Sequence, residues 1–352
     1  MKVAAALAGG TALAATSALA ARRSRDDIHG EVAVVTGGSR GLGLLLAREL
    51  ARCGCPLVIC ARDAAELEEA AAGLRAEGAE VTAVACDVTD QSAAQRLVDT
   101  AVERYGRVDI VVSNAGIIQV GPVQNDQVGH FETALETMAL APVRLALAAL
   151  PAMRRQNHGR IVTIASIGGK MSVPHLLPYS TAKFAAVGFS EGLRAELGRG
   201  PITVTTVVPG LMRTGSHEQA RFTGQADEEF TWFSLGASLP LIPMDAERAA
   251  SQIVEAVRGR RAEIILTPAG QLVSRVASLS PGLTSAVLHL VQTLALPRPA
   301  DAATGGEGAP GYRLNPAMSR KAFDRLTVLG RAAAKRFNER SGSGHGELPA
   351  GR

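Results

Sequence analysis

A tyrosine and a lysine placed four residues apart, Tyr179 and Lys183, are the pair in this chain best suited to acid–base chemistry. They open a stretch with helical periodicity, so both side chains project from one face of the expected helix. A lysine ammonium beside a phenol favours the phenolate and lowers a pKa that is ordinarily about 10. Such a pair can give a proton to a carbonyl oxygen or take one from an alcohol. Ser166, at the end of an expected strand, could supply a hydroxyl group to the same oxygen.

A glycine-rich segment lies between the first expected strand and the first expected helix. Glycines allow a tight turn and let a nucleotide approach the main chain, and the helix start offers unpaired N–H groups to its phosphates. A structural turn with incidental glycines is the alternative, which the strand and helix on either side make weaker. We therefore expect a dinucleotide to contact Thr36, Gly37, Ser39, Arg40, Gly41, Leu42 and Gly43.

Two arginines favour NADPH as that dinucleotide. After the second strand of such folds an acidic residue binds free ribose hydroxyls, whereas a basic residue binds a 2′-phosphate. Arg62 stands at this place, and Arg40 in the glycine turn could complete a guanidinium clamp on the phosphate. Arg62 could instead be a surface residue that pairs with Asp63 or Glu66, and Asp63 would suit NADH. We therefore prefer NADPH over NADH, and we expect no metal.

The elements that must position these residues follow a regular alternation. From residue 32 onward, short apolar runs rich in β-branched residues alternate with longer amphipathic stretches, and Asp245 is placed to cap the last of them. The expected strands span 32–36, 57–61, 81–85, 109–113, 160–165, 202–207 and 263–266. The expected helices span 42–53, 64–77, 91–105, 127–154, 178–199 and 246–258. This alternation predicts an α/β fold with a doubly wound parallel sheet, of Rossmann type, with about seven strands.

Taken together, residues 30–268 resemble the short-chain dehydrogenase/reductase family. The glycine turn is similar to that family's TGxxxGxG motif, residues 113–116 are similar to its NNAG stretch, and Ser166, Tyr179 and Lys183 match its catalytic Ser and YxxxK. Asp87 matches the family's acid that contacts adenine. Pro209, Gly210 and Thr214 resemble its PGxxxT segment beside the nicotinamide. The further residues that the resemblance places at the cofactor are Asp87, Val88, Asn114, Ala115, Gly116, Pro209, Gly210 and Thr214.

The resemblance implies an NAD(P)-dependent oxidoreductase that interconverts a carbonyl and a secondary alcohol. Tyr179 would be the general acid in reduction and the base in oxidation, Ser166 would orient the substrate oxygen, and Lys183 would hold the nicotinamide ribose while tuning Tyr179. One position departs from the family: many members carry an Asn where this chain has Met138, and a thioether cannot replace an amide in a water relay. The hydroxyl group of the neighbouring Thr137 is a candidate to replace the missing amide in that relay. This departure motivates the alternative of a catalytically impaired nucleotide-binding or scaffold protein.

Four of the chain's twelve aromatic residues, Phe222, Phe230, Trp232 and Phe233, fall where a substrate lid is expected. An aromatic lid suggests an apolar, bulky substrate such as a lipid-like or alicyclic ketone. The alternative is that these rings attach the lid to the body or form a subunit contact.

The amino terminus carries a run of 19 residues without charge, Val3–Ala21, preceded by Lys2 and followed by three arginines. Its length can span a bilayer, and the positive-inside rule would then keep the body in the cytoplasm. A signal peptide and an alanine-rich helix that never inserts are the alternatives. We therefore expect residues 1–27 to be an apolar leader or membrane anchor, with the body at the cytoplasmic face of a membrane or otherwise in the cytoplasm.

Residues 28–268 are expected to form one dinucleotide-binding catalytic domain, followed by an extension over 269–352. In the extension, an apolar stretch near 283–296 suggests an interfacial or core-docked helix, and 297–316 reads as a linker. Residues 319–340 alternate basic and apolar positions at roughly helical spacing, which suits a solvated helical face, and the last dozen residues look disordered. A membrane-surface adaptor built on this extension is a third functional reading.

The amino-acid composition excludes several other classes of protein. With 47% hydrophobic and 20% charged residues, wholesale disorder and a small disulfide scaffold are ruled out, and 3% aromatic residues argue against nucleic acid as a partner. The four cysteines, Cys53, Cys55, Cys60 and Cys86, lack CxxC spacing, so buried free thiols are expected. The expected partners are a small-molecule carbonyl or alcohol, a membrane reached through residues 3–21, and further copies of the chain in a homo-oligomer.

Overall fold

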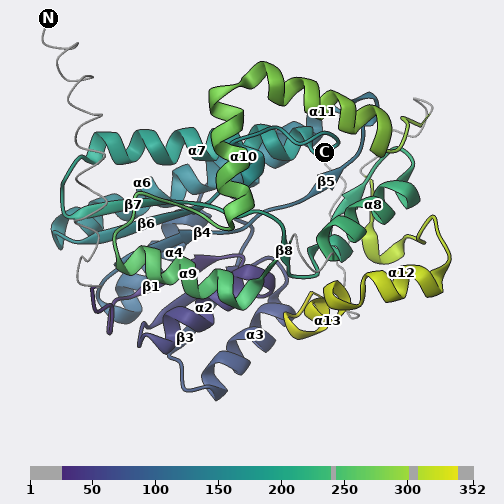
Figure 1. The fold of residues 1–352 in the computed structure, drawn as a ribbon. Coiled ribbons are helices and arrows are strands. Elements are labelled where there is room, and N and C mark those ends of the chain that lie inside the picture. The colour runs from purple at the N-terminus through teal and green to yellow at the C-terminus, as the bar shows by residue number, and fades with distance from the viewer. Residues whose placement is uncertain (1–25, 239–242, 301–307, 340–352) are drawn as a thin grey trace, which may run out of the picture.

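The computed structural model describes residues 26–238, 243–300 and 308–339, so the expected anchor over 3–21 and the expected disordered end lie outside the described residues. Within these ranges seven parallel strands form one sheet, in the order β11-β7-β6-β4-β1-β2-β3 (Figure 1). The strands are β1 (Ala33–Thr36), β2 (Leu57–Ala61), β3 (Val81–Ala85), β4 (Ile110–Ser113), β6 (Gly159–Ile164), β7 (Ile202–Val208) and β11 (Glu263–Ile265). The predicted doubly wound parallel α/β sheet is confirmed.

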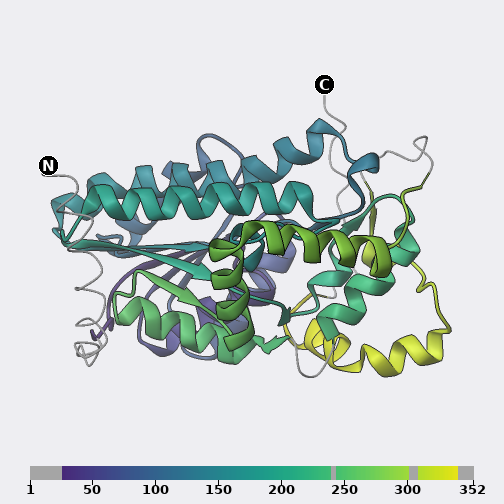
Figure 2. The same ribbon diagram turned by 45° about the horizontal axis from the view of Figure 1, so that its top comes forward.

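Helices cover both faces of the sheet (Figure 2). One face carries α2 (Gly41–Arg52), α3 (Ala64–Ala76) and α9 (Ala246–Arg258), and the other carries α4 (Ala93–Tyr105), α6 (Ala141–Arg155) and α7 (Leu177–Leu197). Successive residues of a strand point to opposite faces, so Val35 joins the apolar cluster of α2 while Val34 joins that of α4. The carboxylate of Asp245 caps α9 as expected, by accepting a hydrogen bond of 3.0 Å from the backbone N–H of Arg248.

The helix expected over 127–154 is interrupted. It consists of α5 (Val128–Leu135), a π-helical turn at Glu136–Leu140, and α6. In the described ranges, the stretch Val128–Arg155 is the one helical segment long and apolar enough to cross a membrane, and 56% of its most apolar window is buried in the fold. More than half of this window is therefore part of the protein core.

The carboxyl-terminal extension packs on the catalytic domain through its last two helices. Its helices are α10 (Pro268–Leu279), α11 (Pro281–Ala295), α12 (Arg320–Leu326) and α13 (Val328–Arg336). The helical spacing after residue 319 is thus confirmed, but the solvated face is wrong for α13, because Ala333 and Phe337 join the core cluster of α2. Small residues permit this close approach: a Cβ on Gly215 would lie 2.3 Å from the side chain of Ala334.

The linker prediction for 297–316 is wrong for its last part. Here β12 (Ala309–Pro310) pairs antiparallel with β9 (Arg221–Phe222), and β9 pairs with β5 (Gln119–Val120). A glycine allows this contact, because a Cβ on Gly311 would lie 2.2 Å from the carbonyl oxygen of His217. The segment therefore forms an edge of the lid region instead of a free connection.

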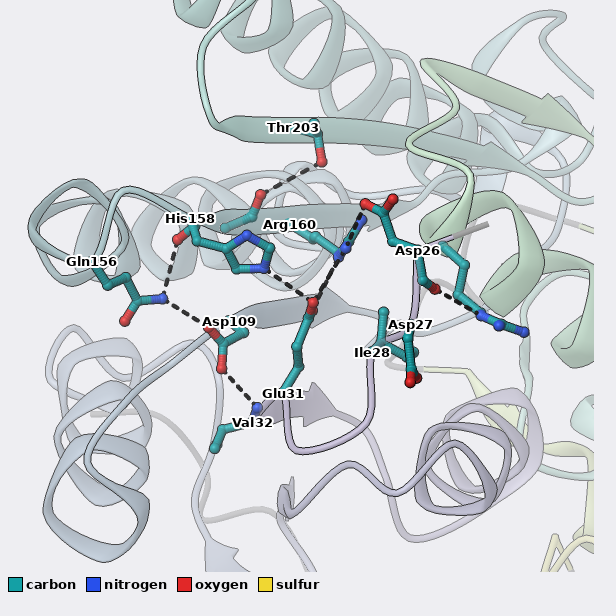
Figure 3. A network of polar contacts seen from close by, with 12 residues as sticks. Asp26, Asp27, Ile28, Glu31, Val32, Asp109, Gln156, His158, Arg160 and Thr203 are labelled. Atoms are coloured by element: carbon teal, nitrogen blue, oxygen red, sulfur yellow. Dashed lines mark hydrogen bonds and ion pairs between the residues drawn. The ribbon is translucent and has the colours of Figure 1, made fainter. Parts of the chain in front are cut away.

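A polar network closes the amino ends of the central strands (Figure 3). The guanidinium of Arg160, which is 2% exposed, lies 3.1 Å from a carboxylate oxygen of Asp26 and 3.0 Å from one of Glu31. It also donates to the carbonyl oxygen of Val257, and His158 lies 3.1 Å from Glu31. These groups pair with one another at the amino ends of the strands, far from the carboxyl ends. The network is therefore structural, and it fixes the start of the described chain.

The cysteines are free thiols, as expected: Cys55, Cys60 and Cys86 are buried and Cys53 is partly exposed. Burial raises the pKa of Cys55 to about 12, so this thiol stays protonated near neutrality.

Candidate active site

The predicted site residues gather at the carboxyl ends of the central strands, because those ends meet at one edge of a parallel sheet. Thr36 ends β1, Asn114 follows β4, Ser166 follows β6 and Pro209 follows β7. The last two segments are joined directly, since the backbone N–H of Ile167 donates to the carbonyl oxygen of Pro209 over 2.8 Å. The structure thus brings residues from four distant parts of the sequence to one place.

The glycine turn is held in one conformation. The side-chain amide of Asn114 donates to the carbonyl oxygens of Thr36 and Gly37 over 3.0 and 3.2 Å. Gly37 has a φ of +65°, and a Cβ on Gly43 would lie 1.9 Å from the carbonyl oxygen of Gly37, so both positions require glycine. The turn opens at Gly41 into α2, which has no side-chain cap. This cradle, with N–H groups at a helix start, fits the phosphates of a dinucleotide.

The two arginines expected to bind a 2′-phosphate are both near carboxylates. Arg40 lies 2.9 Å from Glu66, whose carboxylate also accepts the hydroxyl hydrogen bond of Ser39. Arg62 lies 4.0 Å from Asp87, and its side chain is 54% exposed. Arg62 is therefore only loosely held and free to reorient towards an anion.

The aspartate that would suit NADH has another role. Asp63 caps α3, because its carboxylate accepts hydrogen bonds of 3.0 Å from the N–H groups of Ala65 and Glu66. The pairing of Arg62 with Asp63 or Glu66 that the sequence left open is replaced by the contact with Asp87. The carboxylate of Asp87 also accepts from the backbone and the hydroxyl of Thr89, which fixes its orientation beside Val88.

Ser166, Tyr179 and Lys183 are brought together. Tyr179 lies in the first turn of α7 beside Ser166, whose hydroxyl is placed to donate to the tyrosine oxygen. The Ser166 oxygen accepts a hydrogen bond of 3.1 Å from the N–H of Gly168. The Lys183 Nζ atom lies 5.6 Å from the centre of the Tyr179 ring. Ser166 and Lys183 are buried. A phenol, a hydroxyl group and an amine thus converge as proton transfer to or from one oxygen would require.

The pKa of Tyr179 is shifted in the direction opposite to the one expected from the sequence. Burial raises the pKa of Tyr179, and the hydrogen bond with Ser166 opposes that shift only in part. Burial lowers the pKa of Lys183 to about 8. The expected fall in the tyrosine pKa is wrong for the protein alone, because desolvation disfavours the phenolate more than its neighbours stabilise it.

Met138 lies in the π-helical turn and is 1% exposed. Its side chain joins Ala134 and Ala182 in an apolar cluster against which Tyr179 packs. Thr137, the neighbouring hydroxyl that sequence reasoning considered, instead lines a small cavity together with Ser113 and with residues of α4 and α6. The thioether therefore fills the space beside Tyr179 with apolar atoms.

The segment after β7 begins at the carboxyl ends of the central strands. Gly210 follows Pro209, and the buried Thr214 accepts a hydrogen bond of 3.3 Å from the N–H of Ser216. This turn carries β8 (Met212–Arg213) and leads into the lid helix α8 (Ala226–Ser238).

The aromatic residues of the lid are buried among themselves. Phe222 contacts Phe230 and Phe233 edge to face, with ring centres 5.5 and 5.9 Å apart, and Phe230 also contacts Phe323 of α12. These rings attach the lid and the extension to each other, which favours the second of the two readings that the sequence left open.

Sequence reasoning missed a buried polar contact under the lid. The ring of His175 lies 2.8 Å from a carboxylate oxygen of Glu229, and the Trp232 indole N–H donates to the other oxygen over 2.6 Å. Glu229 is fully buried, and His175 lies just before α7, four residues ahead of Tyr179. The sequence indicates only the half of this contact that lies within α8, where Glu229 and Trp232 are three residues apart on one helix face. His175 is too far away in the sequence to be recognised as their partner.

Comparison with known proteins agrees with this geometry. The short chain dehydrogenase family model matches residues 31–223. A protein assigned as ketoacyl reductase 1 of the granaticin polyketide synthase from Streptomyces violaceoruber is 37% identical over 230 residues, covering 64% of this chain and 85% of the relative. Human estradiol 17-beta-dehydrogenase 11 is 36% identical over 196 residues, covering 55% of this chain and 65% of the relative.

Two solved structures are similar over most of their length. A short chain dehydrogenase/reductase from Burkholderia phymatum in complex with NAD superposes with a TM-score of 0.68 and 26% identity, covering 73% of this chain and 96% of that one. The F189W actinorhodin polyketide ketoreductase with NADPH gives a TM-score of 0.58 and 33% identity, covering 67% and 95%.

Proposed function

This chain belongs to the short chain dehydrogenase family of NAD(P)-dependent oxidoreductases, which act on CH–OH and C=O groups, and we propose that it uses NADPH with Tyr179 as its general acid and base. The observation that carries the proposal is the convergence of Ser166, Tyr179 and Lys183 beside the glycine turn. The dinucleotide supplies or takes the hydride when it is bound.

The chain's own residues would move the proton. In reduction, the Tyr179 hydroxyl gives its proton to the carbonyl oxygen, and the Ser166 hydroxyl holds that oxygen in place. Because burial keeps the pKa of Tyr179 raised, the phenol is protonated near neutrality and ready to donate. Lys183 would hold the nicotinamide ribose, and its ammonium would favour the phenolate that is left behind.

The preference for NADPH rests on the edge of the site where the adenine ribose is expected. Arg62 is exposed and loosely paired, whereas the Asp63 carboxylate is engaged as a helix cap. A mobile guanidinium beside a ribose supports binding of a 2′-phosphate, and an acid that is already occupied does not favour NADH. Similar structures hold either dinucleotide, so the preference comes from these residues alone.

The substrate would be an apolar ketone or the corresponding secondary alcohol. Tyr179 packs against a cluster of apolar side chains that includes Val120, Leu176 and the partly buried Ile118 and Val173. Such surroundings favour a carbon skeleton without charge. Relatives named for ketoacyl and estradiol substrates support the same class.

A membrane would be the source of such a substrate. From 276 to 297 the chain holds no Asp, Glu, Lys or Arg, and Arg275 and Arg298 flank this segment. Helix α11 within it has no buried residue, and Leu283, Leu290 and Leu294 are 57 to 75% exposed. An uncharged helix with exposed leucines between two cations suits the surface of an anionic bilayer.

Vesicle sedimentation tests the membrane proposal. The chain should sediment with phosphatidylglycerol vesicles. Residues 1–27 are removed for the comparison of variants, so that the expected anchor does not mask the effect of α11. In this shortened chain, changing Leu283, Leu290 and Leu294 together to Ser should weaken binding to the vesicles. The matched control is Leu147→Ser, an exposed leucine on α6. Equal binding by the triple variant and the control would contradict a role for α11.

The enzymatic proposal is tested by NADPH oxidation with a panel of small, alicyclic and long-chain ketones. We expect turnover with apolar members of the panel and a lower KM for NADPH than for NADH. Binding of NADPH without oxidation across the whole panel would favour the alternative, a nucleotide-binding or scaffold protein whose catalysis is impaired at Met138.

A further inference from the structure

The last described residues of the extension lie on the glycine turn. The backbone N–H of Gly41, the first residue of α2, donates to the carbonyl oxygen of Phe337 over 2.8 Å. The side-chain amide of Asn338 donates to the carbonyl oxygen of Ser39 over 3.2 Å. The Phe337 ring anchors this segment in the core cluster of α2. The segment 337–339 therefore covers the start of that helix.

Glu339 ends the segment with its carboxylate against the same turn. It is 5% exposed, and its carboxylate lies 3.6 Å from the guanidinium of Arg40. A Cβ on Gly41 would lie 2.5 Å from one of its oxygens, so the carboxylate touches the helix start. Its backbone is fixed as well, because Gln219 donates to its carbonyl oxygen over 2.7 Å.

A carboxylate at a helix start and beside an arginine occupies the kind of place that a phosphate takes. The groups it uses, the Gly41 turn and Arg40, are among those expected to contact the dinucleotide in the proposed function. Two anions cannot share them without repulsion at close range in a poorly hydrated site. Resting on that proposed function, we propose that Glu339 and its segment compete with the phosphates of NADPH for this turn, so that Glu339 sets the affinity for the cofactor.

The charges around Glu339 make the competition sensitive to pH. Burial raises the pKa of its carboxyl group to about 7, with Arg40 opposing the shift and the carboxylates of Glu66 and Glu218 adding to it. Below this pH the group is neutral and repels phosphate less. Above it, the carboxylate holds Arg40 more strongly, so its effect on NADPH binding grows with pH.

The direct test is a fluorescence titration of the full chain with NADPH. Glu339→Gln keeps the shape of the side chain and removes its charge, and Lys335→Gln changes the charge of an exposed residue on the preceding helix, α13. We expect Glu339→Gln to bind NADPH roughly tenfold more tightly, the size of one charge-assisted hydrogen bond, and Lys335→Gln to match the wild type. The advantage of Glu339→Gln should shrink at pH 6 and be full at pH 8, on either side of the pKa.

Hydrogen exchange separates displacement from simple repulsion. The backbone N–H of Glu339 donates to the carbonyl oxygen of Ala334, and that of Phe337 to Ala333. If NADPH displaces the segment, these amides exchange faster when it is added. Slower exchange, or equal NADPH affinity in Glu339→Gln and wild type, would overturn the competition while leaving the proposed function intact. Absence of NADPH binding in every variant would overturn both.

Discussion

The Nζ atom of Lys183 donates a hydrogen bond to the carbonyl oxygen of Ile164, 2.8 Å away, at the end of the strand that leads to Ser166. Among the described residues no acidic side chain pairs with this buried amine. The backbone of β6 thus orients the lysine beneath the Tyr179 ring without neutralising it. Burial alone lowers its pKa, and the group is ready to interact with an incoming ribose hydroxyl.

This burial predicts a pH dependence of stability. The pKa of Lys183 is about 8 in the fold and 10.5 in the unfolded chain, so between these values the unfolded state binds more protons. Stability should therefore rise with pH across this window, by up to about 3 kcal/mol from this group. Urea unfolding below, within and above the window should show that rise for the wild type and not for Lys183→Met. Parallel curves for the two proteins would contradict it.

Sequence patterns were sufficient for the sheet and for the groups at its edge. Alternating β-branched runs and amphipathic stretches determine a parallel sheet, and parallel strands bring their carboxyl ends together, so Thr36, Asn114, Ser166 and Tyr179 meet as expected. The spacing of Tyr179 and Lys183 also defines one helix face. These features depend on local periodicity and on a topology with few alternatives.

Other features depended on contacts between distant segments. The pairing of Glu229 with His175 and the docking of Glu339 on Gly41 have no local pattern, because the partners lie far apart in the sequence. The pKa of Tyr179 was misjudged because the extent of its burial is a tertiary property. The Pro- and Gly-rich segment before residue 316 looked like a linker because composition does not reveal that it pairs with β9.

Met138 provides a test of packing beside the tyrosine. Met138→Asn places an amide in an apolar cluster that offers it few hydrogen-bond partners. It should therefore lower the free energy of unfolding by about 1–3 kcal/mol. Met138→Leu conserves volume and should cost less than about 1.5 kcal/mol. Chemical denaturation measures both. An Asn variant as stable as the Leu variant would mean that water or polar groups reach this position.

Arg62 provides a test of cofactor preference. Arg62→Ala should raise the Kd for NADPH by about 10- to 100-fold, the size of a charge-assisted hydrogen bond to phosphate, and leave that for NADH nearly unchanged. Arg104→Ala, an exposed arginine on α4, is the matched control for loss of one positive charge. Equal losses for NADPH and NADH would contradict a contact with the 2′-phosphate.

Glu229 provides a test of the lid. Glu229→Ala removes a fully buried carboxylate that holds His175 and Trp232, so it should cost about 2–4 kcal/mol of stability and raise KM for the ketone. Glu228→Ala, its exposed neighbour on α8, should change neither. Urea unfolding and steady-state kinetics measure the two effects. A stable Glu229→Ala with unchanged KM would show that this contact does not hold the lid.

The most direct measurement is NADPH oxidation by Tyr179→Phe, with NADPH binding determined on the same sample. The variant keeps the ring that packs on Leu176 and Met138 and removes only the hydroxyl group. We predict a loss of at least about 100-fold in kcat, as expected when a general acid is removed, with the Kd for NADPH within about twofold of the wild type. Turnover by Tyr179→Phe at the wild-type rate would contradict the assignment of Tyr179 as the proton donor.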